Sequence, residues 1–153
     1  MKKGEGYEYK ANDELTSFSF TSVGDKGEIE KKVTITHYRG NWWNLAFGDA
    51  ESDDNFSDTA VSDNNDMRKV LQTITNIAHA FCHKYPSREI YIEPVDNPRK
   101  LLYNRIFQLK EEEILFFFHV RAILFKERFL GKYRPGRLYD AFVLTPRKSI
   151  FGK

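Results

Sequence analysis

The chain has 153 residues, of which 41% are hydrophobic, 30% are charged and 15% are aromatic, and its formal net charge is +2. This composition excludes a disordered chain and suits one domain, residues 1–153, with an aromatic-rich core. The single cysteine, Cys82, excludes an internal disulfide, and the lack of an apolar leader or of about eighteen consecutive apolar residues predicts a cytoplasmic protein outside the membrane.

The charges are distributed unevenly along the chain. Residues 1–67 hold 7 Lys and Arg against 14 Asp and Glu, a net charge of −7, whereas residues 121–153 hold 9 against 2, a net charge of +7. This asymmetry predicts either attraction between the two ends of the folded chain or a basic face for an acidic partner.

Period-two alternation of apolar residues predicts a β meander over about residues 16–48, with glycine-containing turns between its strands. In the last strand Trp43 and Leu45 share one face, which leaves Trp42 on the other. Either another segment of the chain covers Trp42, or Trp42 is an exposed aromatic residue of a protein interface.

Residues 49–66 form a predicted acidic loop, with seven acidic residues and no basic residue. Its last residues, Asn64 to Asp66, are predicted to cap the helix that follows. The loop lacks the glycine and the final glutamate of an EF-hand, and His79 and His83 lack the adjacent glutamate of a zinc-binding His-Glu-x-x-His helix. We therefore expect neither a metal nor another cofactor.

Apolar residues at three- and four-residue intervals predict a helix over residues 66–85. A short strand is expected at residues 89–93. A second helix is expected over residues 98–112, because its first position, Pro98, follows a capping Asp-Asn pair.

Residues 114–125 fit either a buried strand or a helix, because the run is largely apolar. Their aromatic and β-branched content favours a strand, at about residues 115–124. Another alternating segment predicts a closing strand over residues 138–145. Together these elements predict an α+β fold: an antiparallel sheet of about five or six strands with two helices packed on one face.

Two cations follow the predicted start of the second helix. Arg99 and Lys100 lie where the helix dipole is positive, which costs about 0.3 to 1 kcal/mol each unless an anion lies nearby. The sequence therefore indicates an anion or nucleic-acid site, with Tyr103 as a possible stacking ring. The alternative is that both cations pair with the acidic loop and that Tyr103 belongs to the core. Further candidate cations for the same ligand are Arg105, Arg147 and Lys148.

No motif that carries catalysis is present. The sequence has no nucleotide-binding glycine loop, no nucleophile elbow and no cysteine–histidine metal spacing. Cys82 lies in the later half of a predicted helix, at the flank of its apolar face, and is expected to be a buried structural thiol. These features favour a non-catalytic protein.

Short segments spread over nearly the whole chain carry a resemblance to a known family. They are Tyr9-Lys10, Leu15 to Phe20, Gly24 to Lys31, Trp43 to Asp49, Ser62 to Asp66, Lys69 to Leu71, Ala80-Phe81, Lys84 to Pro86, Arg99, Leu102-Tyr103 and Tyr139 to Phe142. In this order they resemble DUF6934, a family of small uncharacterised bacterial proteins found mainly in Bacteroidetes. The resemblance implies one domain with a β-rich amino-terminal half and brings no established activity.

Two functions are consistent with these features. The first is a non-catalytic module that binds another protein through Trp42 and charged patches, as a component of a toxin–antitoxin or phage-conflict locus. The alternative is a nucleic-acid (RNA) binding protein or an RNase-like toxin, which would use the basic start of the second helix and the basic carboxyl-terminal third of the chain.

Overall fold

The computed structural model describes residues 5–50, 56–57 and 64–147. These residues form three helices and a nine-stranded sheet, so the expected α+β class is confirmed. The elements are β1 (Lys10–Ala11), β2 (Ser17–Gly24), β3 (Gly27–Arg39), β4 (Trp42–Ala50), β5 (Phe56–Ser57), α1 (Met67–Lys84), β6 (Glu89–Ile92), α2 (Asn97–Leu109), α3 (Glu111–Phe117), β7 (Phe118–Leu124), β8 (Phe129–Lys132) and β9 (Ala141–Pro146).

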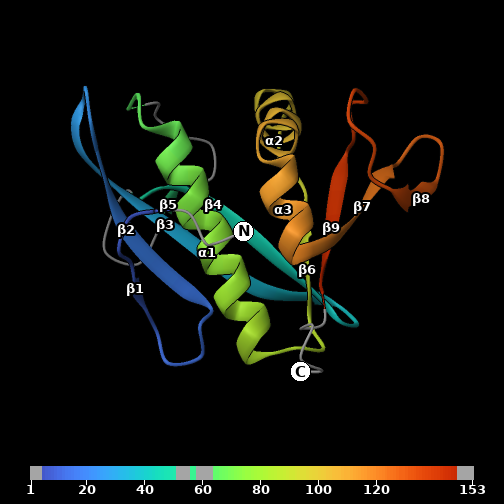
Figure 1. The fold of residues 1–153 in the computed structure, drawn as a ribbon, viewed down its shortest axis with the longest axis horizontal. Coiled ribbons are helices and arrows are strands. Elements are labelled where there is room, and N and C mark those ends of the chain that lie inside the picture. The colour runs from blue at the N-terminus through green and yellow to red at the C-terminus, as the bar shows by residue number, and fades with distance from the viewer. Residues whose placement is uncertain (1–4, 51–55, 58–63, 148–153) are drawn as a thin grey trace.

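The strands form one twisted sheet in the order β1-β2-β3-β4-β6-β9-β7-β8, with β5 paired to β4 outside this order (Figure 1). Neighbouring strands are antiparallel except for β4 and β6, which are parallel. The expectation of a purely antiparallel sheet is therefore wrong at one pairing. The reason is that α1 lies between β4 and β6 in the chain. It acts as a crossover helix, which brings the chain back to the end of the sheet where β4 began, so that β6 runs in the same direction as β4.

The sheet has more strands than the five or six expected. The additional strands are short: β1 and β5 span two residues each and β8 spans four. Segments of this length contain too few residues for a period-two pattern to distinguish them from loops. Pairing with a neighbouring strand, and not local sequence, defines them as strands.

The region after α2 also differs from the prediction. A third helix, α3, occupies residues 111–117, part of which had been assigned to a strand beginning near residue 115. The strand begins at Phe118, whose backbone is extended, with φ −136° and ψ 147°. The apolar run thus holds both a helix and a strand, because helical and extended residues can equally bury an aromatic stretch of this kind.

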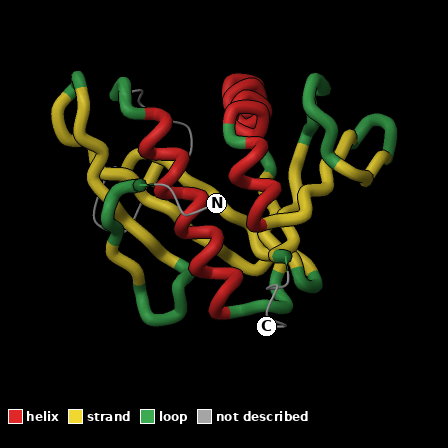
Figure 2. Tube along the Cα trace, in the orientation of Figure 1, coloured by secondary structure: helices red, strands yellow, loops and turns green. Residues whose placement is uncertain are grey.

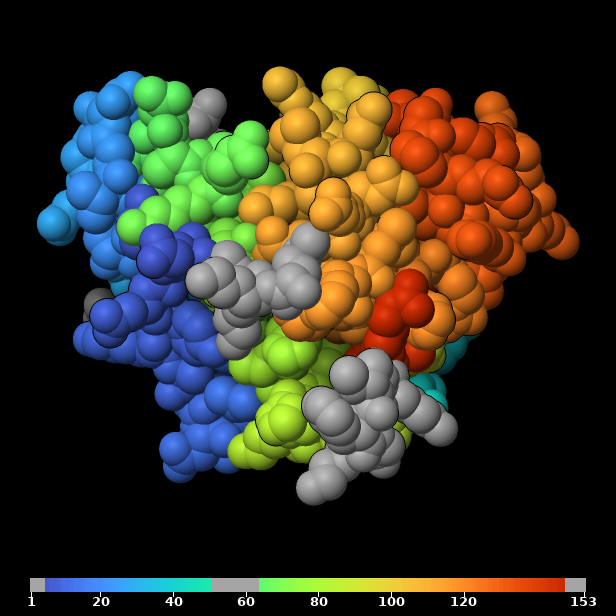
Figure 3. All heavy atoms as spheres, in the orientation of Figure 1, coloured from blue at the N-terminus to red at the C-terminus, as the bar shows by residue number. Residues whose placement is uncertain are grey.

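All three helices lie on the same face of the sheet (Figures 1 and 2). The segment before β1 also packs on this side, where the Tyr7 backbone N–H donates to Thr73 Oγ1 of α1 at 2.7 Å. Figure 3 shows the resulting surface, with residues near the amino-terminal end of the described chain beside α1. The core between sheet and helices is aromatic-rich and includes Phe18, Ile35, Ile77, Phe81, Phe118 and Phe142.

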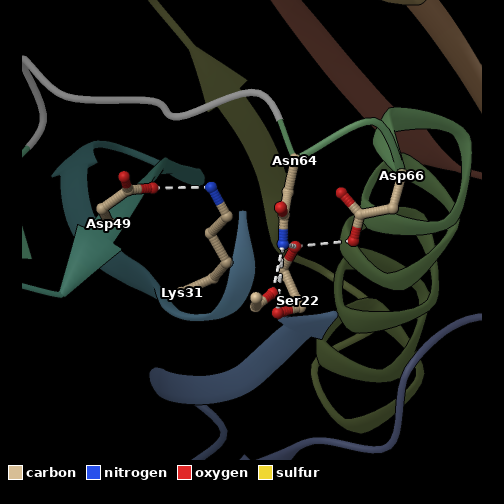
Figure 4. Close-up of polar contacts among 6 residues, drawn as sticks. Ser22, Lys31, Asp49, Asn64 and Asp66 are labelled. Atoms are coloured by element: carbon tan, nitrogen blue, oxygen red, sulfur yellow. Dashed lines mark hydrogen bonds and ion pairs between the residues drawn. The ribbon is translucent and has the colours of Figure 1, made fainter. Parts of the chain in front are cut away.

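The start of α1 is held by the side chain of Asn64, which is 1% exposed. Its amide donates to Ser22 Oγ at 3.2 Å (Figure 4). The amide also donates to Gly27 O at 2.7 Å, and the side-chain oxygen accepts from the Lys26 backbone N–H at 2.5 Å. A Cβ atom at Gly24 would lie 1.9 Å from the Asn64 carbonyl oxygen. Asn64 therefore joins β2 and the β2–β3 turn to the segment that enters α1.

Asp66 occupies the N-cap position of α1, but its side chain makes no capping hydrogen bond. Its carboxylate instead accepts from Tyr7 OH at 2.5 Å and from Ser22 Oγ at 2.6 Å. Burial, together with the bond to Asp66, raises the pKa of Tyr7. The predicted capping role is therefore replaced by bonds that attach the helix start to β2 and to the segment before β1.

A buried ion pair connects β3 and β4, the last two strands of the meander. Lys31 Nζ on β3 lies 2.6 Å from Asp49 Oδ1 on β4, and Lys31 is only 2% exposed (Figure 4). Breaking a buried pair by removing one partner leaves an uncompensated charge in the interior. This pair is therefore a structural element of the sheet.

We predict that Asn64→Ala lowers the free energy of unfolding by about 2 to 4 kcal/mol, because several buried backbone and side-chain groups lose their partners together. The control is Asn41→Ala, since the Asn41 side chain is exposed and makes no hydrogen bond to a described residue. Urea unfolding of both variants measures the difference. Equal stability of the two variants would contradict the role of Asn64.

Candidate functional site

Arg99 lies in the first turn of α2 and is buried, with 5% of its surface exposed. Its Nη1 atom is 2.9 Å from Asp96 Oδ2, and its backbone N–H donates to Asp96 Oδ1 at 2.9 Å. The expectation that this guanidinium faces solvent unneutralised is therefore wrong. The N-cap residue supplies the counter-charge, and Asp96, which the sequence identified only as a helix cap, serves both purposes.

Lys100 is also paired within the chain. Its Nζ atom lies 2.6 Å from Asp140 Oδ1, and the second carboxylate oxygen of Asp140 accepts from the Phe125 backbone N–H at 2.8 Å. Burial would raise the pKa of Asp140, but the bonds from Lys100 and from the Phe125 N–H together hold it below its usual value. Lys100 thus attaches α2 to the segments that flank β8.

The other predicted residues of this site do not converge on it. Tyr103 is buried, and its ring is stacked on Phe47 with 5.5 Å between ring centroids. Arg105 is exposed farther along α2. Arg147 follows β9, where its Nε donates to Leu115 O at 2.6 Å. Lys148 lies outside the described residues.

Trp42 lies on the sheet face opposite the helices, in a stack of three aromatic rings. The Trp42 and Tyr91 centroids are 5.2 Å apart, and the Tyr91 and Tyr38 centroids are 4.5 Å apart, with interplanar angles of 8° and 14°. Trp42 Nε1 donates to Glu89 Oε1 at 3.1 Å. Trp42 is therefore half-buried by its own neighbours, whereas Tyr38 is 49% exposed.

The stack covers a small second core on this face. Tyr91, Ala141 and Val143 are buried there at 2% exposure or less. Glu89 also accepts a hydrogen bond from Thr145 and pairs with Arg121 at 3.0 Å. Burial, with the bond from its hydroxyl to Glu93, raises the pKa of Tyr91. The polar groups beneath the stack are therefore engaged with one another.

Residues 125–138, here called the basic hairpin, form an outlying segment that contains β8 and the turns on either side of it (Figure 1). The hairpin carries five basic residues and one acidic residue, Glu127. Arg137 lies 3.9 Å from Glu127, and both side chains are at least half exposed. Across residues 5–50, 56–57 and 64–147, no ion pair neutralises the other four cations, Lys126, Arg128, Lys132 and Arg134.

Apolar side chains are exposed on the same hairpin. Phe125 is 48% exposed, Leu130 46% and Phe129 37%. The tip of the Phe129 ring lies over Gly131, where an added Cβ would approach it to 2.4 Å. β8 is an edge strand, since β7 is its one partner in the described sheet. The basic hairpin thus presents aromatic and cationic side chains together on an open edge.

The basic hairpin is anchored to the core by Tyr133, which is 6% exposed. Its ring lies 5.9 Å from the Phe107 ring, and its backbone N–H donates to Val120 O at 3.1 Å. Burial raises the pKa of Tyr133. The anchor holds the exposed groups of the hairpin in a fixed position relative to the sheet.

Cys82, the single cysteine of the chain, is buried. Burial raises the pKa of Cys82 to about 12, so its thiol stays protonated at neutral pH. Among the described residues no three His, Cys, Asp or Glu side chains are grouped so that they could hold a metal ion. The helices formed by these residues are all too short or too polar to cross a membrane.

The described residues define an α+β protein with a single mixed sheet, three helices on one face and a basic hairpin at one edge. The chain belongs to DUF6934, a family of unknown function, whose family model matches residues 3–147. Comparisons with curated proteins and with solved structures find no significant match.

The residues of the basic hairpin were not singled out from the sequence. Its excess of positive charge was visible in the count over residues 121–153. Composition does not show which cations pair with acidic residues elsewhere, because those partners are distant in sequence. In the folded chain, Arg99 and Lys100 pair with aspartates, which distinguishes them from the four unpaired cations of the basic hairpin.

We predict that Asp140→Asn lowers the free energy of unfolding by about 1 to 2 kcal/mol at pH 7, because Lys100 loses its counter-ion. The pKa of Asp140 is lower in the folded state than in the unfolded chain, where it is about 3.9. Ionised Asp140 therefore stabilises the folded state fully above about pH 3.9. This stabilisation is lost as the pH falls through the pKa of the folded state. Thermal unfolding from pH 7 to pH 2.5 should therefore show the wild-type advantage shrinking below about pH 4.

The matched control is Asp13→Asn, because the Asp13 side chain is exposed and makes no ion pair with a described residue. Its unfolding curve should follow that of the wild type at each pH. A difference between wild type and Asp140→Asn that stayed constant over the whole range would contradict the assigned pKa direction.

Proposed function

We propose that the chain is a non-catalytic module that binds single-stranded nucleic acid through the basic hairpin. The observation that carries this proposal is the meeting of four unpaired cations and two exposed aromatic rings on one outlying hairpin. Proteins that bind single strands without sequence preference combine a positively charged track for the backbone with aromatic side chains on which bases stack.

The unpaired cations of the basic hairpin are suited to phosphate contacts because no acidic side chain among the described residues competes for them. At the start of α2, Arg99 and Lys100 each pair with an aspartate, so the charge of each is already balanced within the chain. Lys126, Lys132 and Arg134 make no such pair with the described residues. Phosphate contacts release counter-ions from the nucleic acid, which gives binding a strong salt dependence.

The exposed rings favour nucleic acid over an acidic polypeptide as the ligand. A purely acidic partner would need cations alone, whereas Phe125 and Phe129 place π-faces beside them. Every base has a face that can stack on such a ring, and each stacked base contributes about 1 to 3 kcal/mol.

The test is fluorescence anisotropy with a labelled oligouridine of about 15 nucleotides, titrated at several salt concentrations. The triple variant Lys126→Gln, Lys132→Gln, Arg134→Gln should weaken binding at least about tenfold near 0.1 M salt and reduce the slope of log K against log salt by about 2. The double variant Phe125→Ala, Phe129→Ala should weaken binding at least about tenfold without changing the slope.

The control is Lys10→Gln, Lys26→Gln, Arg39→Gln, which removes the same charge from three exposed cations on strands β1 and β3 and on the β2–β3 turn. It should leave the affinity close to that of the wild type. Equal loss in the control, or no binding by the wild-type protein at low salt, would refute the proposal. The labelled strand should also remain intact after incubation, whereas cleavage would support an RNase instead.

A second candidate function is protein binding through the aromatic stack, and the observation that favours it is the exposure of Tyr38. Tyr38 is 49% exposed, and its ring is stacked on that of Tyr91, which is stacked in turn on Trp42. Rigid aromatic side chains of this kind are enriched at the energetic centres of protein interfaces. The partner proposed is the product of a neighbouring gene in a toxin–antitoxin or phage-conflict locus.

For this second function, Tyr38→Ala should weaken the complex with such a gene product by about tenfold or more, because it removes a central aromatic contact. Gel filtration of the co-expressed pair gives the measurement. Phe116→Ala is the matched control, since Phe116 is 48% exposed on α3, on the helical side of the sheet. Persistence of an isolated monomer with every neighbouring product would exclude this function.

A further inference from the structure

The guanidinium of Arg99 has two nitrogen atoms without a hydrogen-bond partner. Nη1 is bound to Asp96, but Nε and Nη2 are buried and unpaired. In the described part of the chain, the one other buried side-chain nitrogen or oxygen atom without a hydrogen-bond partner is Glu113 Oε2. Buried polar groups almost always have partners, because an unsatisfied donor loses its bonds to water without replacement.

The two unpaired atoms lie on the same edge of the guanidinium. Their N–H bonds are nearly parallel, and this spacing matches the two oxygens of a carboxylate or of a phosphate. The Asp96 contact uses the opposite end of the group, so it leaves this edge intact. Arg99 therefore keeps a bidentate donor pair that its own counter-ion does not use.

The surroundings of this edge favour an anion. The bond to the N-cap residue Asp96 places the guanidinium at the amino-terminal end of α2, a helix of 13 residues with a positive dipole end there. Asp96 balances the charge of Arg99 and Asp140 balances that of Lys100. An anion bound here would be attracted by the positive end of the helix dipole and could accept from the two free donors of Arg99. The negative charges of Asp96 and Asp140 are each balanced by a cation.

The segment that leads into the site lies at the surface. Val95 is 58% exposed, and Asp96, Asn97 and Pro98 are also exposed. We propose that the Nε–Nη2 edge of Arg99 is a binding site for a small oxyanion, either a phosphate group or a carboxylate. This site does not depend on the function proposed for the basic hairpin.

The test measures thermal unfolding at pH 7.5 in inorganic phosphate, in acetate and in chloride, each at the same ionic strength. Phosphate or acetate should raise the melting temperature of the wild type by at least about 3 °C relative to chloride. Arg99→Lys keeps the charge but loses the paired donors, so it should lose the rise. The comparison of phosphate with acetate shows which oxyanion the site prefers.

Two control variants separate this site from other cations. Arg105→Lys makes the same change at an exposed position on the same helix and should retain the rise. The triple variant of Lys126, Lys132 and Arg134 should retain it as well, which distinguishes the Arg99 site from phosphate binding by the basic hairpin. A rise that persisted in Arg99→Lys, or a wild type that responded to ionic strength alone, would overturn the proposal.

A second measurement covers the case in which Arg99→Lys does not fold. In the wild-type protein labelled with ¹⁵N-arginine, the Nε–H resonance of Arg99 should shift on titration with phosphate and show slower exchange with water. The Nε–H resonance of Arg105 should stay unchanged and provides the internal reference. An Arg99 resonance that does not move at saturating phosphate would overturn the proposal without any variant.

Discussion

The buried amide of Asn64 is the contact on which the arrangement of the other elements depends. It joins β2 and the β2–β3 turn to the segment that enters α1, and each of its donors and acceptors is used. Because α1 connects β4 to β6, the position of its first turn also determines where β6 lies beside β4. The aromatic stack on one face of the sheet and α2 on the other both follow from that placement. A polar group this deeply buried specifies one arrangement, since other arrangements would leave it unsatisfied.

The start of α2 shows how paired charges serve the architecture. Lys100 reaches Asp140, and Asp140 accepts the Phe125 N–H, so a single carboxylate connects α2 to both sides of the basic hairpin. Asn104 adds a second link, because its amide exchanges hydrogen bonds with the backbone of Tyr139. Cations near a helix start are unfavourable when exposed, and the two aspartates here remove that penalty. Four cations of the basic hairpin, Lys126, Arg128, Lys132 and Arg134, make no ion pair with the described residues, which leaves them available for a ligand.

Much of the fold could be predicted from local patterns, whereas the pairing of charges could not. Alternation identified β2, β3 and β4, and the spacing of residues such as Ile77 and Phe81 identified α1, because these patterns reflect burial on one face. The boundary between α3 and β7 was misplaced, because an aromatic run looks alike in both states. The roles of Asp96 and Asp66 were predicted only as helix caps, since their further partners, the Arg99 guanidinium and the Tyr7 and Ser22 hydroxyls, are chosen by tertiary structure. The basic hairpin was singled out only once Arg99 and Lys100 were seen to pair with aspartates.

The uneven charge of the chain persists in the folded protein. Of the ion pairs between described residues, none joins residues 5–66 to residues 121–147, so the two ends do not neutralise each other through such contacts. Residues 5–50 carry 5 basic and 8 acidic residues, a net charge of −3, and residues 121–147 carry 7 and 2, a net charge of +5. The strands of the first group, β1 to β4, form one side of the sheet, and β7 and β8 lie at the other edge. An approaching polyanion is therefore repelled by one side and attracted by the other, which orients it toward the basic hairpin before any contact forms. This orientation acts over distances near the Debye length, about 8 to 10 Å at physiological salt. Added salt should therefore weaken it, as it should weaken the phosphate contacts proposed for the basic hairpin.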